Sequence, residues 1–439
     1  MIHLMKGQNL YDKAKKLIPT GTQLLSKRPE RFLPSGWPSY YDHAKGVEVW
    51  DLDGNKYIDM SISAVGSCIL GVADSDVDAA AIDAIKRGSM STLNAPEEVE
   101  LAELLIELHP WAEMVRYTRT GGEAMAVAIR IARAASGKDV VAFCGYHGWH
   151  DWYIAAQLGS QDALAGHLRA GLDPAGVPQV LAGTALPFHY NQIEELEAIV
   201  AEKGKALGAI VMEPIRGQEP KDNFLQKVRS IADKLGIPLI VDEISAGFRL
   251  TCGGAHLLYD LKPDIAVLGK GMSNGYPMAA IIGKRDVMMA AEKSFISSTY
   301  WSERVGPAAA IATIKKHRKH AVHEHLIHMG TLVQDGWKKA AESAGLSLDV
   351  SGMKPMSHFA MKCDSPQAAH TYFTQAMLER GFLASPDFYA TFAHTEKHVE
   401  QYLVSCTEVF AEIVKALKEG TLQTMIPGEA ARAGFKRYA

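Results

Sequence analysis

Several features that would define a class of protein are scarce in this 439-residue sequence. Its five cysteines include no C-x-x-C pair, which disfavours a disulfide framework and suits reduced thiols in a cytoplasm. No apolar run reaches the ~18 residues that a membrane span needs, and the first residues lack the apolar core of a signal peptide. The net charge of −4 is small and leaves no basic stripe. We therefore expect a cytoplasmic protein with no nucleic-acid or membrane partner.

The composition that is present is that of a folded globular protein. Hydrophobic residues make up 47% of the chain and charged residues 22%. A chain of this length exceeds what one small core can organise, so we expect one large domain and a smaller partner.

Short apolar runs alternate with helical patterns between about residues 115 and 300. The helical patterns include residues 123–136 and 223–236. The apolar runs occupy residues 114–118, 139–145, 207–214, 237–244 and 263–270. This order predicts an α/β domain with a mostly parallel sheet, whose ligands lie at the carboxyl ends of the strands.

The two ends of the chain follow a different pattern. Near the start, two alternating apolar runs flank Asp53-Gly54, which is a hairpin signal. After about residue 305, long helical stretches at 306–345 and 395–418 flank a mixed α/β patch. We expect residues 61–305 to form the large domain, and residues 1–60 and 306–439 to form one smaller α/β domain together.

A glycine turn leads from the first of these runs into a helical pattern. Thr120 and Glu123 have the spacing of a capping box, and Gly121 and Gly122 would let a ligand approach the backbone amides at the positive end of a helix. The motif predicts a phosphate site. An ordinary capped helix would show the same residues, so this motif alone leaves both interpretations open.

The run at 237–244 contains two adjacent acids, Asp242 and its neighbour, of which only one can face a given side of a strand. An apolar run followed by two acids also resembles the Walker B strand of a nucleotide hydrolase, which requires a Walker A loop elsewhere. The sequence around Lys270 does not supply that loop. Asp264 stands where its first glycine should be, and Gly271 where Ser or Thr should be. This alternative is therefore disfavoured.

A lysine at the end of a buried strand needs a reason to be there. Lys270 closes the apolar run at 263–270, and the acid Asp242 and the turn at Thr120 lie on other elements of the same predicted sheet. These groups match the needs of pyridoxal phosphate. A lysine forms a Schiff base with its aldehyde, a carboxylate keeps its pyridine nitrogen protonated, and helix-terminal amides hold its phosphate.

Several motifs in order along the chain resemble the class III, fold type I aminotransferases, and most closely the glutamate-1-semialdehyde 2,1-aminomutase-like branch. They are VWDLDGNKYIDM (49–60), TGGEAMAVAIRIARAASGKD (120–139), CGYHGWHD (144–151), VMEP (211–214), IPLIVDEISAGFR (237–249), PDIAVLGKGMSNGYPMAAIIG (263–283) and SSTYWSERVGPAAAIATI (297–314). The resemblance covers nearly the whole chain and implies a pyridoxal-phosphate enzyme.

The resemblance implies a role for residues around the cofactor ring. Lys270 would form the Schiff base and move a proton between the substrate and the cofactor. Asp242 would pair with the pyridine nitrogen. Ile244 would pack on one face of the ring, and Tyr146 would stack on the other.

The same resemblance implies residues for the phosphate and for a second subunit. Thr120, Gly121 and Gly122 would hold the phosphate, and Thr299 would reach the phosphate of the neighbouring subunit's cofactor. Glu213 would lie near the cofactor's 3′-oxygen or the substrate. The active unit would then be a homodimer with its active sites at the subunit interface.

The sequence departs from the aminomutases where the substrate would bind. Trp301 stands in the segment that relatives continue as Ser-Gly-Asn-Pro, and Phe388-Tyr389 stands where aminomutases carry Phe-Glu. Arg28 or Arg31, near the place where aminomutases bind a substrate carboxylate, would serve an acidic substrate. We name Trp301, Tyr389, Arg28 and Arg31 as candidate substrate residues.

These departures favour an aminotransferase, which moves an amino group from an amino-acid donor such as glutamate to a carbonyl acceptor in a ping-pong cycle. An intramolecular aminomutase or an amino-acid racemase on the same scaffold is the alternative. A catalytically silent homologue would bind the cofactor without responding to amino donors.

Five histidines between residues 315 and 328 raise the question of a metal. Only some pairs of them share a helix face, and no acid or cysteine completes a site. The histidines at 147–151 are better explained by the Tyr-His-Gly motif. We assign no metal.

Overall fold

The computed structural model describes residues 5–159, 163–164, 167, 172–215 and 217–432. The described residues form two compact units. Unit 1 takes its residues from the ranges Met1–Asp74 and Glu324–Ala433, and unit 2 from Ser75–His323. Both ends of the chain thus contribute to unit 1.

The limits of the units lie later in the chain than the limits at residues 60 and 305 that the sequence patterns indicated. Helix α10 (Val305–His320) makes extensive contacts with α2 (Ser75–Lys86), so both belong to unit 2. The expected helical stretch at 306–345 is broken at Ala321, whose φ of 45° ends α10 before α11 (Val322–Ala344) begins. This break lies beside the boundary of the units.

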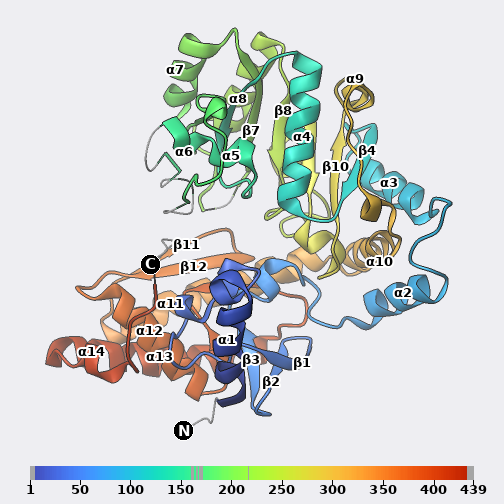
Figure 1. Cartoon of the computed structure of the whole chain (residues 1–439). Helices are drawn as coiled ribbons and strands as arrows, with labels where there is room; N and C mark the ends of the chain where they lie inside the picture. Colours follow the sequence, from blue (N-terminus) through green and yellow to red (C-terminus); the bar gives the residue numbers. More distant parts are fainter. Residues whose placement is uncertain (1–4, 160–162, 165–166, 168–171, 216, 433–439) are drawn as a thin grey trace. The chain divides into compact units, whose positions relative to one another are not determined.

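Unit 2 is built on a seven-stranded sheet with the order β4-β10-β9-β8-β7-β5-β6. The strands are β4 (Met114–Thr118), β10 (Ala279–Gly283), β9 (Ile265–Leu268), β8 (Leu239–Asp242), β7 (Leu207–Met212), β5 (Val140–Cys144) and β6 (Ala185–Pro187). Strand β10 runs antiparallel to both of its neighbours, and the described pairs from β9 to β6 are all parallel. The predicted α/β fold with a mostly parallel sheet is confirmed (Figure 1).

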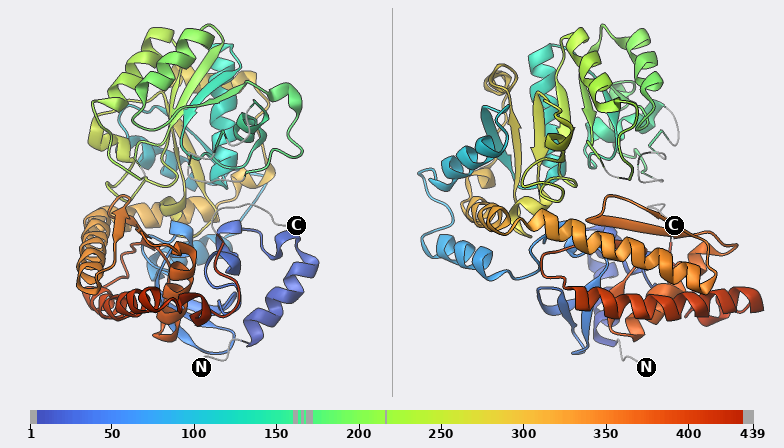
Figure 2. Two further views of the ribbon diagram at one scale, coloured as in Figure 1. Left: turned by 90° about the vertical axis from the view of Figure 1, so that its left-hand side faces the viewer. Right: turned by 180° about the vertical axis from the view of Figure 1, so that it is seen from behind.

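Helices cover both faces of this sheet. Successive side chains of a strand point to opposite faces, so an apolar strand presents an apolar surface on each side that a helix can bury. On β7, Ala209 and Val211 belong to the apolar core that contains α4 (Gly121–Ser136), whereas Ile210 and Met212 belong to the core that contains α8 (Phe224–Leu235). The views in Figure 2 show these helices on opposite sides of the strands. Burial on both faces explains why the strands read as continuous apolar runs.

The remaining helices of unit 2 are shorter or lie beside the sheet. They are α3 (Glu97–Leu108), α5 (Asp151–Ile154), α6 (Ala156–Gly159), α7 (Ile193–Lys203) and α9 (Arg285–Met288). Within the described residues, no helix has the length and apolar character that crossing a bilayer requires.

Unit 1 combines two small sheets with long helices. One sheet has the order β1-β2-β3-β13 and the other the order β11-β12-β14. The strands are β1 (Tyr41–Lys45), β2 (Glu48–Asp51), β3 (Lys56–Met60), β11 (Leu348–Ser351), β12 (Met356–Met361), β13 (Phe382–Ala384) and β14 (Asp387–Tyr389). The helices are α1 (Met5–Leu17), α11 (Val322–Ala344), α12 (Pro366–Glu379), α13 (Glu396–Glu419) and α14 (Leu422–Met425).

The predicted hairpin around Asp53-Gly54 is present between β2 and β3. The Asp51 carboxylate accepts hydrogen bonds from the backbone N–H groups of Asp53 and Asn55, at 2.9 and 2.8 Å. Strand β3 then pairs in parallel with β13, which follows it by more than 300 residues in the sequence. This pairing joins the two ends of the chain.

Candidate active site

Most of the predicted cofactor residues follow the carboxyl ends of neighbouring strands in unit 2. Thr120, Gly121 and Gly122 follow β4, Tyr146 follows β5, Glu213 follows β7, Asp242 ends β8 with Ile244 just beyond it, and Lys270 follows β9. Carboxyl ends of parallel strands meet at one edge of a sheet, which is where α/β proteins bind ligands. The sheet therefore gathers these residues at one edge.

Asp242 is fixed by a buried histidine. His147 Nδ1 lies 2.8 Å from Asp242 Oδ2, and His147 Nε2 lies 3.1 Å from the carbonyl oxygen of Cys144. Because a carbonyl can only accept, Nε2 must carry a hydrogen, and the Asp242–His147 contact then holds a second proton between the two side chains. The backbone N–H of Ile244 donates to the other carboxylate oxygen of Asp242 at 3.0 Å.

The role of His147 was missed at the level of sequence. The Tyr-His-Gly motif drew attention to Tyr146, and nothing local connects His147 with Asp242, which lies 95 residues later. Both side chains are almost completely buried. Only the parallel pairing of β5, β7 and β8 brings them together.

Lys270 lies in a backbone conformation that is uncommon for its residue type. Its φ of 43° is in the left-handed region, which costs a residue with a side chain roughly 1–2 kcal/mol. Such residues cluster at functional sites. The Nζ atom donates a hydrogen bond to Ser245 Oγ at 2.7 Å, so the amine is held beside the segment that follows β8.

The glycine turn packs closely against the segment that follows β8. A Cβ atom on Gly121 would lie 2.9 Å from Ile244 Cδ1, a distance that real Cβ contacts do not show. At the start of α4, the Glu123 carboxylate accepts hydrogen bonds from the backbone N–H groups of Arg119 and Thr120, at 2.9 and 3.3 Å. The hydrogen bond from Thr120 N–H to the Glu123 side chain is the one that the capping-box spacing predicts.

A second histidine borders this turn. A Cβ atom on Gly122 would lie 3.1 Å from His150 Nδ1, and the indole ring of Trp149 stacks on the His150 ring with 4.3 Å between ring centroids. Burial lowers the pKa of His150 below its usual value. His150 is therefore a neutral neighbour of the turn at neutral pH.

Tyr146 and Glu213 lie together at the ends of β5 and β7. The backbone N–H of Tyr146 donates to Glu213 Oε2 at 3.3 Å. Gly145 has a φ of 114°, and a Cβ atom there would lie 2.6 Å from the same oxygen, so only glycine fits. The Tyr146 ring meets the Tyr153 ring edge-on at 5.9 Å.

Trp301 lies against the start of α4. Its indole N–H donates to Glu123 Oε1 at 2.9 Å, and its carbonyl accepts from the Arg119 guanidinium at 3.0 Å. Trp301 is therefore attached to the same Glu123 that caps the glycine turn. Thr299, two residues earlier, is exposed.

Three candidate substrate residues belong to unit 1. The contacts within unit 2, where the cofactor residues lie, therefore say nothing about their predicted role. The Tyr389 backbone N–H donates to Ser61 O at 2.8 Å, and Arg28 Nε lies 3.7 Å from Glu30 Oε2. Arg31 lies in the short helical turn that contains Glu30. Tyr389, Arg28 and Arg31 stay predictions.

Three of the five histidines between residues 315 and 328 contact separate oxygen atoms. His317 Nε2 contacts Phe248 O, His325 Nε2 contacts His394 O, and His328 Nε2 contacts Glu396. Among the residues that the structure describes, no group of three or more His, Cys, Asp or Glu side chains could hold a metal ion.

The α/β architecture and the lysine, carboxyl and glycine turn at one sheet edge are those of fold type I pyridoxal-phosphate enzymes, and solved structures of this class are similar to the chain. The internal aldimine form of the Sphingopyxis sp. MTA144 FumI protein, which contains pyridoxal phosphate, matches with a TM-score of 0.84 and 26% identity, over 94% of this chain and 97% of that one. The chain is therefore an enzyme whose cofactor is pyridoxal phosphate.

Within that class, the chain belongs to the class-III aminotransferases, whose family model matches residues 35–394. It is 32% identical over 429 residues to the 3-aminobutyryl-CoA aminotransferase of Cloacimonas acidaminovorans, covering 95% of this chain and 99% of that protein. It is also 32% identical over 437 residues to the glutamate-1-semialdehyde 2,1-aminomutase of Desulforamulus reducens, covering 93% and 98%.

Proposed function

We propose that this enzyme is an intermolecular aminotransferase that moves an amino group from an amino-acid donor, with glutamate as the expected donor, to a carbonyl acceptor in a ping-pong cycle. The observation that carries this proposal is the placement of a hydrogen-bonded lysine amine and a histidine-paired carboxyl on adjacent strands, β9 and β8. A lysine and a carboxyl at this edge are the two groups that pyridoxal-phosphate chemistry requires of the protein.

When bound, pyridoxal phosphate supplies an aldehyde for amine attachment and a pyridine ring that accepts electrons from the reacting carbon. In our proposal, Lys270 Nζ is the attachment point for the aldehyde. The same Nζ atom, when free, would remove the proton from the substrate carbon and act as the proton carrier of the site. Loss of the Lys270 amine would therefore remove both functions.

Asp242 holds a proton at the pyridine nitrogen in this proposal. Its carboxyl group is almost completely buried, and His147 fixes one oxygen while Ile244 N–H fixes the other. Among the described residues, His147 is the one ion-pair partner of Asp242. A protonated ring nitrogen beside this carboxyl would be stabilised by it. The Ile244 and Tyr146 side chains would pack on the two faces of the ring.

Gly121 and Gly122 bind the phosphate in this proposal, together with Thr120. They are the first residues of α4, where backbone N–H groups have no acceptor within the helix and the helix dipole favours an anion. In the capping box, Glu123 takes the N–H of Thr120 and the Thr120 side-chain oxygen accepts from the Glu123 N–H, so the Thr120 O–H and the glycine amides would be the donors to the phosphate. Glu213, next to Tyr146, would contact the cofactor's 3′-oxygen or the substrate.

We also propose that the active form is a homodimer, in which Thr299 reaches the phosphate of the neighbouring subunit's cofactor. Large side chains near Thr299 are exposed: Phe295 is 90% exposed and Tyr300 is 68% exposed. Leu93, which is 80% exposed, lies in a segment tied to this region by the hydrogen bond from Arg304 N–H to Ser89 O. A second copy would cover these side chains. A monomeric holoenzyme in sedimentation equilibrium would contradict this.

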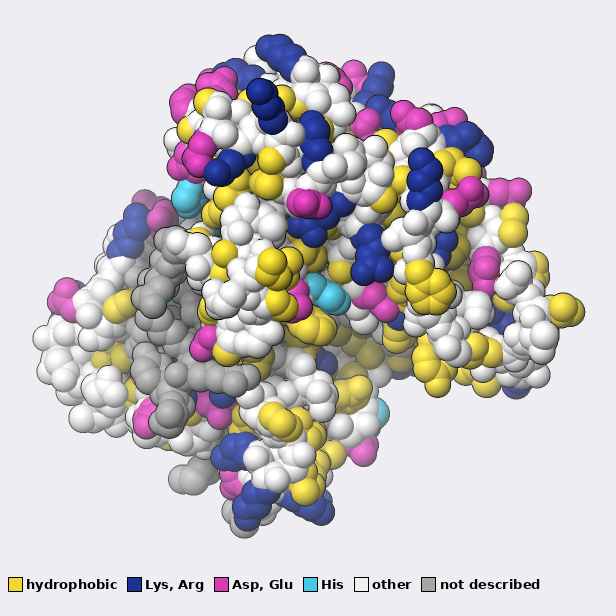
Figure 3. Space-filling model, turned by 45° about the horizontal axis from the view of Figure 1, so that its top comes forward, with side chains coloured by type: hydrophobic (Ala, Val, Ile, Leu, Met, Phe, Trp, Pro, Cys, Tyr) yellow, Lys and Arg dark blue, Asp and Glu magenta, His cyan; other side chains and the backbone are white. Residues whose placement is uncertain are grey.

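The surface and the cysteines fit a small-molecule enzyme of the cytoplasm. On the face drawn in Figure 3, Lys and Arg side chains are interspersed with Asp and Glu side chains, in keeping with the small net charge of −4. All five cysteines are free thiols, which supports a reducing compartment. We therefore propose a cytoplasmic location.

An intramolecular aminomutase or a racemase is the second candidate, because aminomutases are among the similar proteins. An aminomutase has to retain its diamino intermediate, and this chain has Tyr389 where those enzymes carry an acid that gates the site. Without that acid, exchange with an external acceptor is favoured.

Transfer of labelled nitrogen separates these candidates. Purified holoenzyme would be incubated with a screen of ¹⁵N-labelled donors, including glutamate and 3-aminobutyryl-CoA, and with a set of keto acids and aldehydes as acceptors. We expect the label to appear in the acceptor. Conversion of a substrate without any exchange of nitrogen would contradict the aminotransferase proposal and favour an aminomutase or a racemase. A spectrum that no donor changes would indicate a catalytically silent homologue.

A further inference from the structure

We infer that Ser245 is a positioning residue for Lys270, which holds the lysine amine in both of its protonation states. This inference rests on the proposed function and extends it to a residue that has no role in the cofactor site proposed above. Its basis is the 2.7 Å hydrogen bond between Lys270 Nζ and Ser245 Oγ, in a place where Ser245 is only 5% exposed.

The backbone of Ser245 is itself held in place by a hydrogen bond. Its carbonyl oxygen accepts a hydrogen bond from Arg249 Nε at 2.7 Å, and the Arg249 side chain is completely buried. The backbone turns tightly here, because Gly247 N–H donates to Glu243 O at 2.7 Å. A Cβ atom on Gly247 would lie 2.7 Å from that same oxygen, so the turn requires glycine. The Ser245 hydroxyl therefore projects from a rigid segment.

Lys270 needs such a partner because its side chain is long. A lysine side chain loses up to about 2 kcal/mol of rotamer entropy when it is ordered. The left-handed backbone at Lys270 fixes where the side chain begins, and Ser245 fixes where it ends. Asp242 on β8 is the register partner of Val267 on β9, the strand that leads to Lys270. The hydrogen bond to Ser245 therefore keeps the Lys270 amine beside the end of β8, where Asp242 lies.

A hydroxyl suits an amine that must change its protonation state. It can accept a hydrogen bond from a protonated amine and donate one to the lone pair of a neutral amine. A carboxylate can only accept, and would favour the protonated amine throughout. Ser245 can therefore keep Nζ in position while that atom loses and regains a proton. Ser245 itself transfers no proton.

The test compares Ser245→Ala with Ser245→Thr, which keeps the hydroxyl. Ser273→Ala is a matched control, because Ser273 is also buried and lies near Lys270 but donates its hydrogen bond to Tyr276 O. The first readout uses the enzyme freed of cofactor. Labelling of Lys270 by a soluble acylating reagent at fixed pH is followed by peptide mass spectrometry. We expect Ser245→Ala to label roughly threefold to tenfold faster, the range for the loss of one hydrogen bond.

The second readout uses the holoenzyme in a single half-reaction with an amino donor. We expect Ser245→Ala to slow the rate by roughly tenfold without changing the donor concentration for half-saturation, because the lost contact positions the amine rather than the substrate. Ser245→Thr should restore most of the rate. Ser273→Ala should match the wild type in both readouts.

The inference is overturned if Ser245→Ala folds with an unchanged melting temperature and matches the wild type in both readouts. It is also overturned if Ser273→Ala reproduces the effects of Ser245→Ala, since both would then report general loosening. A wild-type enzyme that shows no half-reaction with any donor would contradict the proposed function instead. Labelling of the cofactor-free protein would still decide whether Ser245 holds Lys270.

Discussion

The two edges of the unit 2 sheet each hold a buried aspartate, but in opposite surroundings. At the carboxyl edge, Asp242 is paired with His147 and a backbone N–H. At the amino edge, Asp264 accepts hydrogen bonds from Lys284 Nζ and Arg229 Nη1, both at 2.7 Å, and from the backbone N–H of Leu239 at 2.8 Å. One carboxylate is therefore balanced by two permanent cations and the other by a single imidazole.

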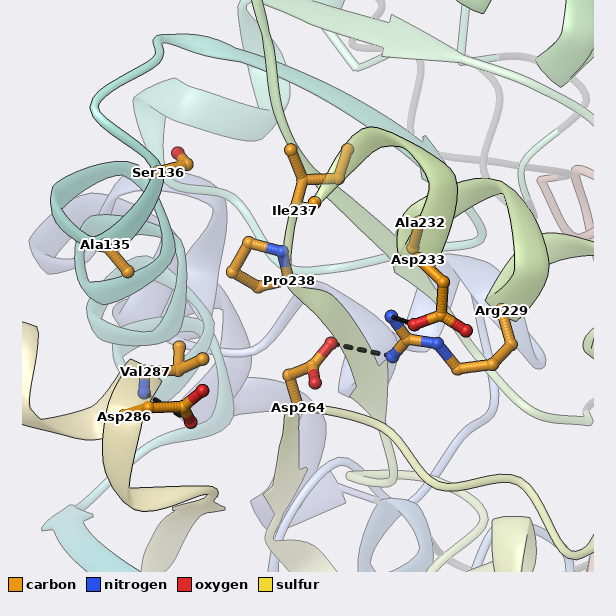
Figure 4. Close-up of a pocket in the computed structure, with 11 residues that line it drawn as sticks. Ala135, Ser136, Arg229, Ala232, Asp233, Ile237, Pro238, Asp264, Asp286 and Val287 are labelled. Atoms are coloured by element: carbon orange, nitrogen blue, oxygen red, sulfur yellow. Dashed lines mark hydrogen bonds and ion pairs between the residues drawn. The ribbon is translucent and has the colours of Figure 1, made fainter.

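The amino edge also has a cavity. A pocket of about 360 Å³ is lined there by residues that include Arg229, Asp233 and Asp264. Figure 4 shows the Arg229 guanidinium reaching the carboxylates of both Asp233 and Asp264, so each of these two acids is already paired with a cation. A hollow with buried charge is thus not enough to define an active site. In our proposal, the carboxyl edge is distinguished by Asp242, which is paired with His147, and by Lys270, whose amine is held by Ser245 on the next strand connection.

The largest expected effect is at the carboxyl edge. Asp242→Asn removes the negative charge but keeps the shape, so the pyridine nitrogen would lose its partner. We expect the half-reaction with an amino donor to slow by roughly 10³-fold, as for the loss of one preorganised electrostatic group. The measurement is single-turnover absorbance at saturating cofactor, with the melting temperature as the control for folding. A loss below about tenfold would show that Asp242 does not pair with the ring.

The same kind of change at the amino edge should affect stability instead. Asp264→Ala removes the carboxylate that binds both Arg229 and Lys284. Arg229 keeps its second partner, Asp233. We expect the free energy of unfolding to fall by about 2 to 3 kcal/mol, less than for a fully buried pair because the Lys284 side chain is 37% exposed. Denaturant titration measures this. The rate of the half-reaction with an amino donor, per folded molecule, should stay within about twofold of the wild-type rate, because the substitution lies away from the proposed site.

A smaller effect is expected on the stability of the folded protein at low pH. Burial opposes the ionisation of Asp264, but the hydrogen bonds from Lys284 and Leu239 N–H and the charge of Arg229 outweigh it and lower the pKa of Asp264. Because the pKa is depressed in the folded state, this stabilisation is present above the unfolded-state pKa of about 3.9 and is lost as pH falls through the lower folded-state pKa.

Asp264→Asn tests this dependence, since asparagine does not titrate. The difference in free energy of unfolding between wild type and Asp264→Asn should be constant from neutral pH down to about pH 5 and should shrink below about pH 4. Acid titrations of both proteins in denaturant would measure it. A difference that does not change down to pH 2 would contradict an ionised Asp264 as the source of stability.

The strands and the lysine could be predicted because their signals are local. The apolar runs at 207–214 and 237–244 contain β7 and β8, and burial on both faces makes such runs visible in the sequence. Lys270 stood out as a cation at the end of one of them. The strand β10 was not predicted, because its place in the sheet is completed by pairing with β4, whose residues lie far away in the sequence, as well as with the nearby β9.

The contacts that complete the site could not be predicted, for the same reason. His147 meets Asp242 across 95 residues, and Ser245 meets Lys270 across 25. The left-handed backbone of Lys270 and the break at Ala321 have no periodicity to reveal them, since neither residue is a glycine. Family resemblance pointed to the individual groups, but the geometry that links them comes from the packing of the strands.

Chemical trapping of the cofactor on the protein is the most direct test of Lys270 as the attachment point. Holoenzyme would be reduced with borohydride, digested, and searched by mass spectrometry for a pyridoxyl group, with Lys270→Ala as the matched control. We expect one modified site, Lys270, in the wild type, and neither the Schiff-base absorbance nor a trapped adduct in Lys270→Ala. An adduct on any other lysine, or one that persists in Lys270→Ala, would contradict it.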